Sequence, residues 1–269
     1  MANPLPQCRS SADPAQVRQP LYLTARRRSV VDSDGRSLWV SPTTGPVARF
    51  PLSRLSRVVA RGVLQWRQAA LVALIRADIP LVVLAKDEPL AVLSPMPRLP
   101  HPCGTRLEEI VCQPGWEVRY QNWLRSARMR VLTAWSQAQE SAATPVSEET
   151  FRALVRACVY QHPETAFSSG LVRGALAAIA SRCLSRAGLQ LSYWGFGGSL
   201  LDLAADLTGL LDIALSLECG AWMAQAHGND EALLSLVYPA IDEVAKLAPQ
   251  LLGHFGRWVQ ETADSWPSI

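Results

Sequence analysis

The chain has 269 residues, of which 49% are hydrophobic and 18% charged, so a substantial core is available and disorder is not expected. Acidic residues interrupt the longest apolar region, Leu200 to Met223, and no uncharged run approaches the ~20 residues of a membrane-spanning helix. The N-terminus lacks the apolar core of a secretion signal. These features exclude a membrane-spanning class, and we expect a cytoplasmic protein.

The net charge of +3 conceals an asymmetry along the chain. Residues 1–130 carry 19 Lys or Arg and 9 Asp or Glu, whereas residues 131–269 carry 7 and 14. A basic half and an acidic half indicate a surface that faces a polyanion or a self-complementary interface, with an ordinary solvated surface as the alternative. The six cysteines include no C-x-x-C pair, which favours reduced thiols over a zinc site.

Short apolar runs between turn signals predict a β-rich N-terminal domain over residues 18–95. Residues 32–36, Asp-Ser-Asp-Gly-Arg, are typical of a hairpin turn, because Asp and Gly supply the left-handed conformations that such turns need. After Gly62 the apolar period changes and predicts one helix. The expected strands cover residues 21–23, 29–31, 37–40, 47–52, 57–61, 81–85 and 90–93, and the helix covers 68–76.

A Pro/Gly-rich stretch over residues 96–115 breaks every regular pattern and predicts a linker. Beyond it we expect a helical domain over residues 116–265, so the fold class is α+β. Ser147, followed by Glu148 and Glu149, is typical of a capped helix start with an acidic first turn. The expected helices cover residues 116–139, 147–161, 167–188, 200–226, 230–247 and 250–265.

Five segments carry a resemblance when they are taken in order. They are the strand and glycine turn Arg57 to Val63, the strand Asp78 to Leu84, the small-residue helix Gly170 to Ala187, the turn Ala187 to Phe196, and the acidic helix start Ser199 to Leu207. Together they resemble the CRISPR-associated spacer integrases, the Cas-one family, over about two thirds of the chain. The resemblance implies a β-domain followed by a helical domain, and DNA as a partner.

Active members of that family are expected to bind a divalent metal through a Glu, a His and carboxylates, because strand joining needs a metal to activate the hydroxyl nucleophile. In this chain Gly198 stands at the His position. Asp202 and Asp206 lie four residues apart on the acidic helix, with Ala205 at the family's position, and Glu149 is the nearest match to the Glu. His162 or Glu164 could replace a lost ligand.

The residual catalytic candidates are therefore Asp202, Asp206 and Glu149, and Asp202 and Asp206 are weak metal candidates. Two acids at a helix start also stabilise the helix through its dipole, which is the simpler interpretation. We expect no cofactor, or Mg or Mn if the site still functions.

The expected function is a Cas-one-like DNA-binding and assembly subunit that lacks robust integrase-nuclease activity. Alternatives are a divergent metal-dependent DNA endonuclease or integrase, and an unrelated helical scaffold protein. Candidate DNA contacts are Arg26, Arg27, Arg28, Arg57 and Arg61, although the Arg26–Arg28 run could equally be a solvated strand edge. The resemblance implies a homodimer or a complex with CRISPR-associated proteins, either a Cas-two-like protein or an active Cas-one.

Overall fold

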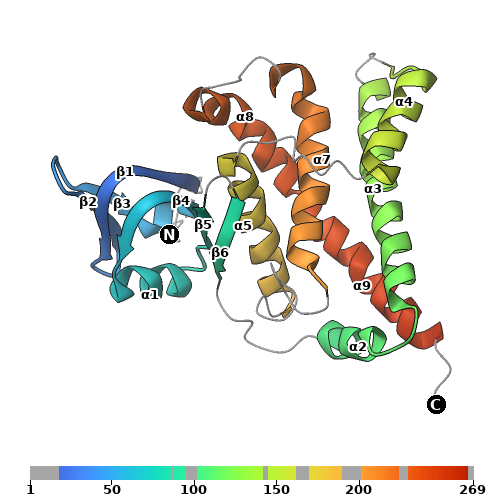
Figure 1. Ribbon diagram of the computed structural model, residues 1–269, viewed down its shortest axis with the longest axis horizontal. Helices are drawn as coiled ribbons and strands as arrows, with labels where there is room; N and C mark the ends of the chain where they lie inside the picture. Colours follow the sequence, from blue (N-terminus) through green and yellow to red (C-terminus); the bar gives the residue numbers. More distant parts are fainter. Residues whose placement is uncertain are drawn as a thin grey trace, which may run out of the picture.

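A six-stranded sheet precedes a group of helices in the computed structural model, which describes residues 18–85, 88–94, 102–141, 145–161, 170–189, 201–223 and 230–265 (Figure 1). The predicted α+β class is confirmed. Within those ranges, each helix is too short or too polar to cross a membrane. The strands are β1 (Gln19–Ser33), β2 (Ser37–Pro42), β3 (Ala48–Pro51), β4 (Leu55–Trp66), β5 (Leu81–Ala85) and β6 (Glu88–Leu93), with the short helix η1 (Leu52–Arg54) before β4 and α1 (Gln68–Arg76) after it.

The sheet has the order β3-β2-β1-β4-β5-β6, with parallel pairs in the centre and antiparallel hairpins at both ends. The predicted β1–β2 turn is present: Asp34 Oδ1 accepts hydrogen bonds from the backbone N–H groups of Arg36 and Ser37, and Gly35 has a φ of 85°. Two strands are longer than predicted. β1 joins the two runs that we expected as separate strands, and β4 continues past Gly62 to Trp66.

The helices follow the predicted order, with one addition. They are α2 (Pro102–Val111), α3 (Trp116–Ser141), α4 (Glu148–Val155) with the π-helical turn η2 (Arg156–Tyr160), α5 (Gly170–Arg186), α7 (Leu203–Met223), α8 (Asp230–Ala245) and α9 (Leu247–Ser265). Helix α2 lies in the stretch that we expected to be irregular, so that expectation is wrong over residues 102–111. Pro102 occupies the first helical position, where proline is tolerated, and Leu107, Ile110 and Val111 are buried on one face.

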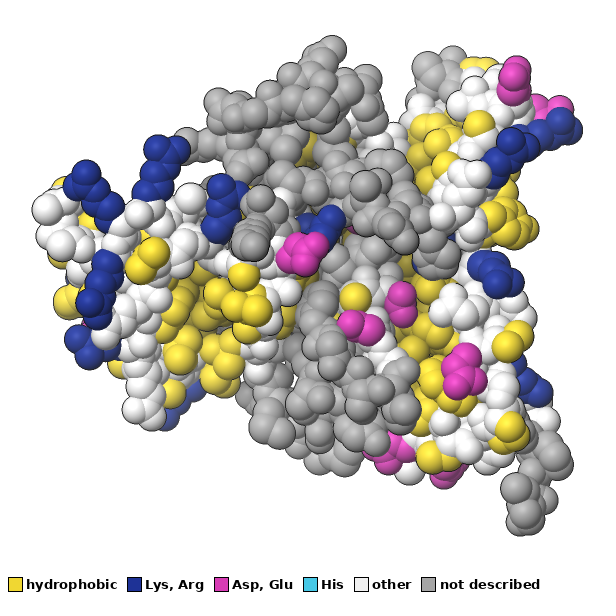
Figure 2. Space-filling view, viewed as in Figure 1, with side chains coloured by type: hydrophobic (Ala, Val, Ile, Leu, Met, Phe, Trp, Pro, Cys, Tyr) yellow, Lys and Arg dark blue, Asp and Glu magenta, His cyan; other side chains and the backbone are white. Residues whose placement is uncertain are grey.

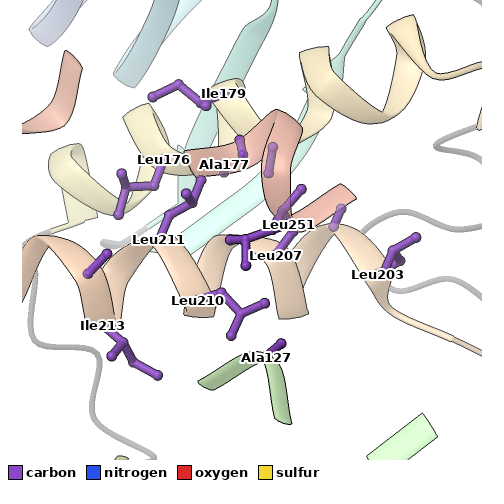
Figure 3. Packing of buried hydrophobic residues seen from close by; sticks show 14 of the residues in the cluster. Ala127, Leu176, Ala177, Ile179, Leu203, Leu207, Leu210, Leu211, Ile213 and Leu251 are labelled. Carbon is purple, nitrogen blue, oxygen red and sulfur yellow. The ribbon is translucent and has the colours of Figure 1, made fainter. Parts of the chain in front are cut away.

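Helix α5 lies between the sheet and the other helices (Figure 1). Its small residues let it pack closely against β4, β5 and β6, and a Cβ added at Gly174 would lie 2.7 Å from Cγ1 of Val59. On its other side, Leu211 of α7 approaches Leu176 of α5 (Figure 3). The division into a β-domain and a helical domain stays a prediction, since Val59 belongs to the same core cluster as these helices.

Alternate residues of β4 face opposite cores, as a two-residue period requires. Val59 packs with the helices, whereas Val58 and Ala60 belong to a second core that Leu74 of α1 covers. The sheet is thus covered on both faces.

An ion-pair cluster at the edge of this packing connects the turn after α1 to helix α5. Asp78, which has a φ of 55°, accepts hydrogen bonds from Arg182 Nη2 at 3.0 Å and Arg186 Nη2 at 2.7 Å. Partial burial raises the pKa of the Asp78 carboxyl, but the two guanidinium groups outweigh it and the pKa lies below its usual value. The carboxylate therefore remains charged at neutral pH.

Close packing at Gly174 predicts opposite effects for one substitution at two helical glycines. Gly174→Ala gains ~1 kcal/mol of helix propensity but places a methyl against Val59 and Leu84, and such overpacking costs about 1–3 kcal/mol, so we expect a net loss of about 1 kcal/mol. Gly209→Ala, at an exposed α7 position with open space, should gain up to about 1 kcal/mol. Urea unfolding measures both, and equal changes would contradict the packing.

Candidate functional site

Asp202 and Asp206, the two carboxylates predicted to remain from a metal site, lie at the start of α7. Asp202 directly precedes the helix, and its Oδ1 accepts a hydrogen bond from the backbone N–H of Ala205 at 3.1 Å. Its carbonyl oxygen accepts the N–H of Asp206 at 2.9 Å. A short acidic side chain in this position satisfies a helix-start N–H and interacts favourably with the helix dipole. Asp202 therefore caps α7.

Asp206, one turn further along, is hydrogen-bonded to α3. The Tyr120 hydroxyl donates to Oδ2 of Asp206 at 2.6 Å, the length of a charge-assisted bond. Tyr120 is 3% exposed, and burial together with the negative charge of Asp206 raises its pKa far above the usual range. The phenol therefore stays protonated and remains a donor to the carboxylate.

A buried cation on α3 complements this carboxylate. Arg128 lies eight residues after Tyr120, on the same side of the helix, and is 9% exposed. Burial lowers the pKa of Arg128, and the charge of Asp206 offsets part of that effect. Because a guanidinium stays protonated in proteins, α3 presents both a phenol and a positive charge to the first turn of α7.

A catalytic divalent ion needs several oxygen or nitrogen ligands held together. Here Oδ1 of Asp202 and Oδ2 of Asp206 each accept a hydrogen bond from the protein. Within the part of the chain that the structure describes, no group of three or more His, Cys, Asp or Glu side chains could hold a metal. The other ligand positions considered, His162, Glu164 and Gly198, lie outside the described residues.

Glu149, the third catalytic candidate, lies apart from this cluster. It is exposed in the first turn of α4, where Ser147 caps the helix by accepting a hydrogen bond from the Thr150 N–H. Figure 1 shows that α4 begins beside the C-terminal end of α3, whereas Tyr120 is near the start of that 26-residue helix, which is roughly 40 Å long. The structure brings Asp202 and Asp206 together and leaves Glu149 at the far end of α3.

Three of the candidate DNA contacts project from a bulge in β1. Ala25 pairs with Gly62 of β4 and Ser29 pairs with Leu64, so Arg26, Arg27 and Arg28 stand opposite a single residue. All three arginines are exposed to solvent. Gly62 has a φ of 102°, and a Cβ there would lie 2.0 Å from the Ala25 carbonyl oxygen. Figure 2 shows arginine side chains over the strands at the left of the molecule.

Arg57 and Arg61 of β4 differ from the bulge arginines. Arg61 is half-buried and pairs in register with Thr24. Arg57 is 5% exposed, and its guanidinium lies 3.5 Å from Oδ1 of Asp242 on α8. A buried arginine paired to a carboxylate cannot reach a phosphate without breaking that pair. We therefore leave Arg57 out of the proposed DNA-contacting set.

Tyr120 and Arg128 escaped the sequence analysis. They lie about 80 residues from Asp206, in α3, where Trp116 and Trp123 are buried in the main core. A signal was present: the eight-residue spacing places Arg128 on the face that Tyr120 and Trp123 occupy, and a charged residue on an apolar face indicates a buried partner.

The fold is α+β, with helices on both faces of a mixed six-stranded sheet. No family model matches the sequence, and no curated protein is significantly similar to it. Among solved structures, the chain is similar to a CAS1 protein from Thermotoga maritima, with a TM-score of 0.62 and 12% identity over 90% of this chain and 97% of that one. It is also similar to TtCas1, with a TM-score of 0.53 and 14% identity over 87% and 97%. The chain therefore has the Cas1 fold, as the sequence resemblance implied.

The Tyr120–Asp206 hydrogen bond predicts that removing the Tyr120 hydroxyl destabilises the protein, whereas removing the hydroxyl of an exposed tyrosine does not. Tyr120→Phe removes the hydroxyl that donates to the Asp206 carboxylate and leaves a partly buried charge less well satisfied, which should lower the free energy of unfolding by about 1–3 kcal/mol. Tyr160→Phe makes the same chemical change at a side chain that is 66% exposed and should have little effect. Thermal and urea unfolding test the pair, and indistinguishable variants would contradict the bond.

Proposed function

We propose that the chain is a divergent, Cas1-related subunit that binds DNA and assists assembly in CRISPR adaptation, without robust integrase or nuclease activity. The observation that carries this proposal is the hydrogen bond from Tyr120 to Asp206, in a chain that keeps the Cas1 fold. Asp206, one residue past the position that resembles a metal ligand, accepts a hydrogen bond from a phenol and lies in the field of a buried arginine, Arg128.

Strand joining would require this arrangement to come apart. A metal activates the attacking hydroxyl and offsets charge on the phosphate, so its ligands must be available together. For Asp206 to bind a metal, it would have to give up the Tyr120 hydrogen bond and share its charge between the metal and Arg128. Giving up a hydrogen bond to a partly buried group costs about 1–3 kcal/mol, and a metal there would bring a second positive charge near buried Arg128. This cost favours a binding role over a catalytic one.

The bulge arginines support the DNA-binding part of the proposal. Arg26, Arg27 and Arg28 are adjacent, reach solvent and are held by a glycine-dependent distortion of β1 against β4. Arg28 Nη2 also donates to the Gln65 side chain at 2.9 Å, which orients its guanidinium. Three closely spaced positive charges suit the phosphates of a DNA backbone, without sequence preference. We include half-buried Arg61 as a further contact.

We also propose a homodimer or a complex with a Cas2-like or an active Cas1 protein, located in the cytoplasm. The end strands β3 and β6 leave backbone groups available for pairing. Apolar side chains are exposed near both: Val47, just before β3, is 56% exposed, and Leu90 of β6 is 71% exposed. Exposed apolar groups at sheet edges are typical of protein interfaces.

The DNA proposal predicts salt-sensitive binding that survives a chelator, with no strand joining. Purified protein is incubated with branched DNA and manganese, and binding is measured by fluorescence anisotropy while products are resolved on gels. Arg26→Gln/Arg27→Gln/Arg28→Gln should weaken binding and reduce the slope of log affinity against log salt by about 0.9 for each phosphate that the protein no longer neutralises.

The matched control is Arg119→Gln/Arg125→Gln/Arg152→Gln, which removes the same charge from exposed positions in the helical half. It should bind branched DNA nearly as well as the unchanged protein. Robust metal-dependent cleavage or joining that disappears in Asp202→Ala/Asp206→Ala would overturn the non-catalytic proposal and establish a divergent integrase.

The assembly proposal predicts that the protein sediments as a dimer at micromolar concentration, or as a complex when it is mixed with the products of neighbouring genes. Leu90→Glu places a charge on the exposed edge strand and should shift the dimer toward monomer. A monomer in both experiments would rule out this mode of assembly.

A further inference from the structure

A cavity of about 250 Å³ opens between α3 and α9, away from the bulge arginines. Each helix contributes one face to it, since the lining positions recur at intervals of three and four residues. The lining residues are Trp123, Ser126, Ala127 and Arg130 of α3, and Leu251, His254, Arg257, Trp258 and Glu261 of α9. The cavity is smaller than the ~300–1,000 Å³ typical of pockets for drug-sized ligands, so it suits a single small unit.

Two guanidinium groups meet at one imidazole in this cavity. Arg257 Nη2 donates to Nδ1 of His254 at 2.5 Å, and Arg130 Nη1 also lies within hydrogen-bond distance of that nitrogen. Because a guanidinium can only donate, Nδ1 is the acceptor and the proton is on Nε2. Partial burial and the charges of Arg130 and Arg257 lower the pKa of His254. The imidazole is thus neutral, and two positive charges converge with Glu261 as the one carboxylate in the lining.

An aromatic wall stands beside these charges. The rings of Trp123 and Trp258 are 6.1 Å apart, and both pack against Phe255. Trp258 is only partly buried and is one of the residues that line the cavity. A tryptophan face next to paired arginines combines a stacking platform for a base with donors for a phosphate.

The cavity also lies close to the start of α7. Tyr120, which donates to Asp206, has its ring 5.5 Å from Trp123 and 5.9 Å from Trp258. One aromatic ring therefore separates the cavity wall from the acidic residues that resemble the integrase site. A strand held in the cavity would lie beside that position.

We propose that this cavity binds one nucleotide of single-stranded DNA, with the phosphate on Arg130 and Arg257 and the base against Trp258. The proposal rests on the proposed DNA-binding function and adds a second contact of different specificity. Duplex DNA stacks its bases on one another and cannot offer a base face to Trp258, so the cavity selects unpaired nucleotides. The bulge arginines contact backbone phosphates of either form.

The test compares fluorescein-labelled oligothymidine with duplex DNA on the full chain. Arg130→Gln/Arg257→Gln should weaken oligothymidine binding by at least about tenfold, lower its salt slope by about 0.7 for each phosphate left without its arginine, and leave duplex affinity unchanged. Arg119→Gln/Arg125→Gln removes the same charge from exposed α3 positions outside the cavity and should change neither affinity.

Glu261→Gln should change oligothymidine affinity in the opposite direction, and a misfolded variant would not bind more tightly. It removes the carboxylate from the lining and should tighten oligothymidine binding severalfold. If both cavity variants bind oligothymidine like the unchanged protein while duplex binding persists, the cavity proposal is wrong and the DNA-binding function stands. If the variants affect only oligouridine, the cavity serves RNA and the single-stranded DNA proposal is wrong. If the unchanged protein binds no DNA at all, both proposals fail.

Discussion

The packing of α5 against the sheet is the contact on which the rest of the molecule depends. Gly174 lets the helix axis approach Val59 and Leu84 more closely than any side chain would permit, and the opposite side of α5 receives the leucines of α7. α7 in turn places Asp206 against α3. The sheet, α5, α7 and α3 therefore form one continuous series of contacts, in which the position of the acidic helix start is fixed by apolar packing.

Most of the fold could be predicted because its elements carry strong local signals. The Asp-Gly turn before β2 and the Ser147 cap of α4 both act through neighbouring residues, so the sequence reveals them directly. The continuity of β1 could not be seen, since its bulge exists only through pairing with Gly62 on a distant strand. Helix α2 was hidden because Pro102 suggests a break, whereas the burial of Leu107 that stabilises the helix depends on the rest of the core.

The candidate site was predictable only in part, for a related reason. The capping role of Asp202 follows from its distance to Ala205, three residues away. The partner of Asp206 is 86 positions away, and no local pattern specifies which face of α3 meets α7. Arg57 shows a similar limit: a basic residue in a basic half suggested a phosphate contact, and no sequence pattern indicated its partner Asp242, on a helix near the other end of the chain. Long-range electrostatic pairs are decided by packing.

Gly62, which pairs with Ala25 beside the arginine bulge, has a consequence for how the proposed DNA contact could be lost. At position 62 even a methyl group would meet the Ala25 carbonyl, so β1 and β4 would have to separate or realign. Such a chain would keep its net charge of +3 and every arginine, yet the three guanidinium groups would no longer be displayed together. A count of charged residues would not distinguish this variant from the unchanged protein. Changes that abolish the proposed DNA contact can therefore arise at uncharged backbone positions, where a survey of basic residues would not find them.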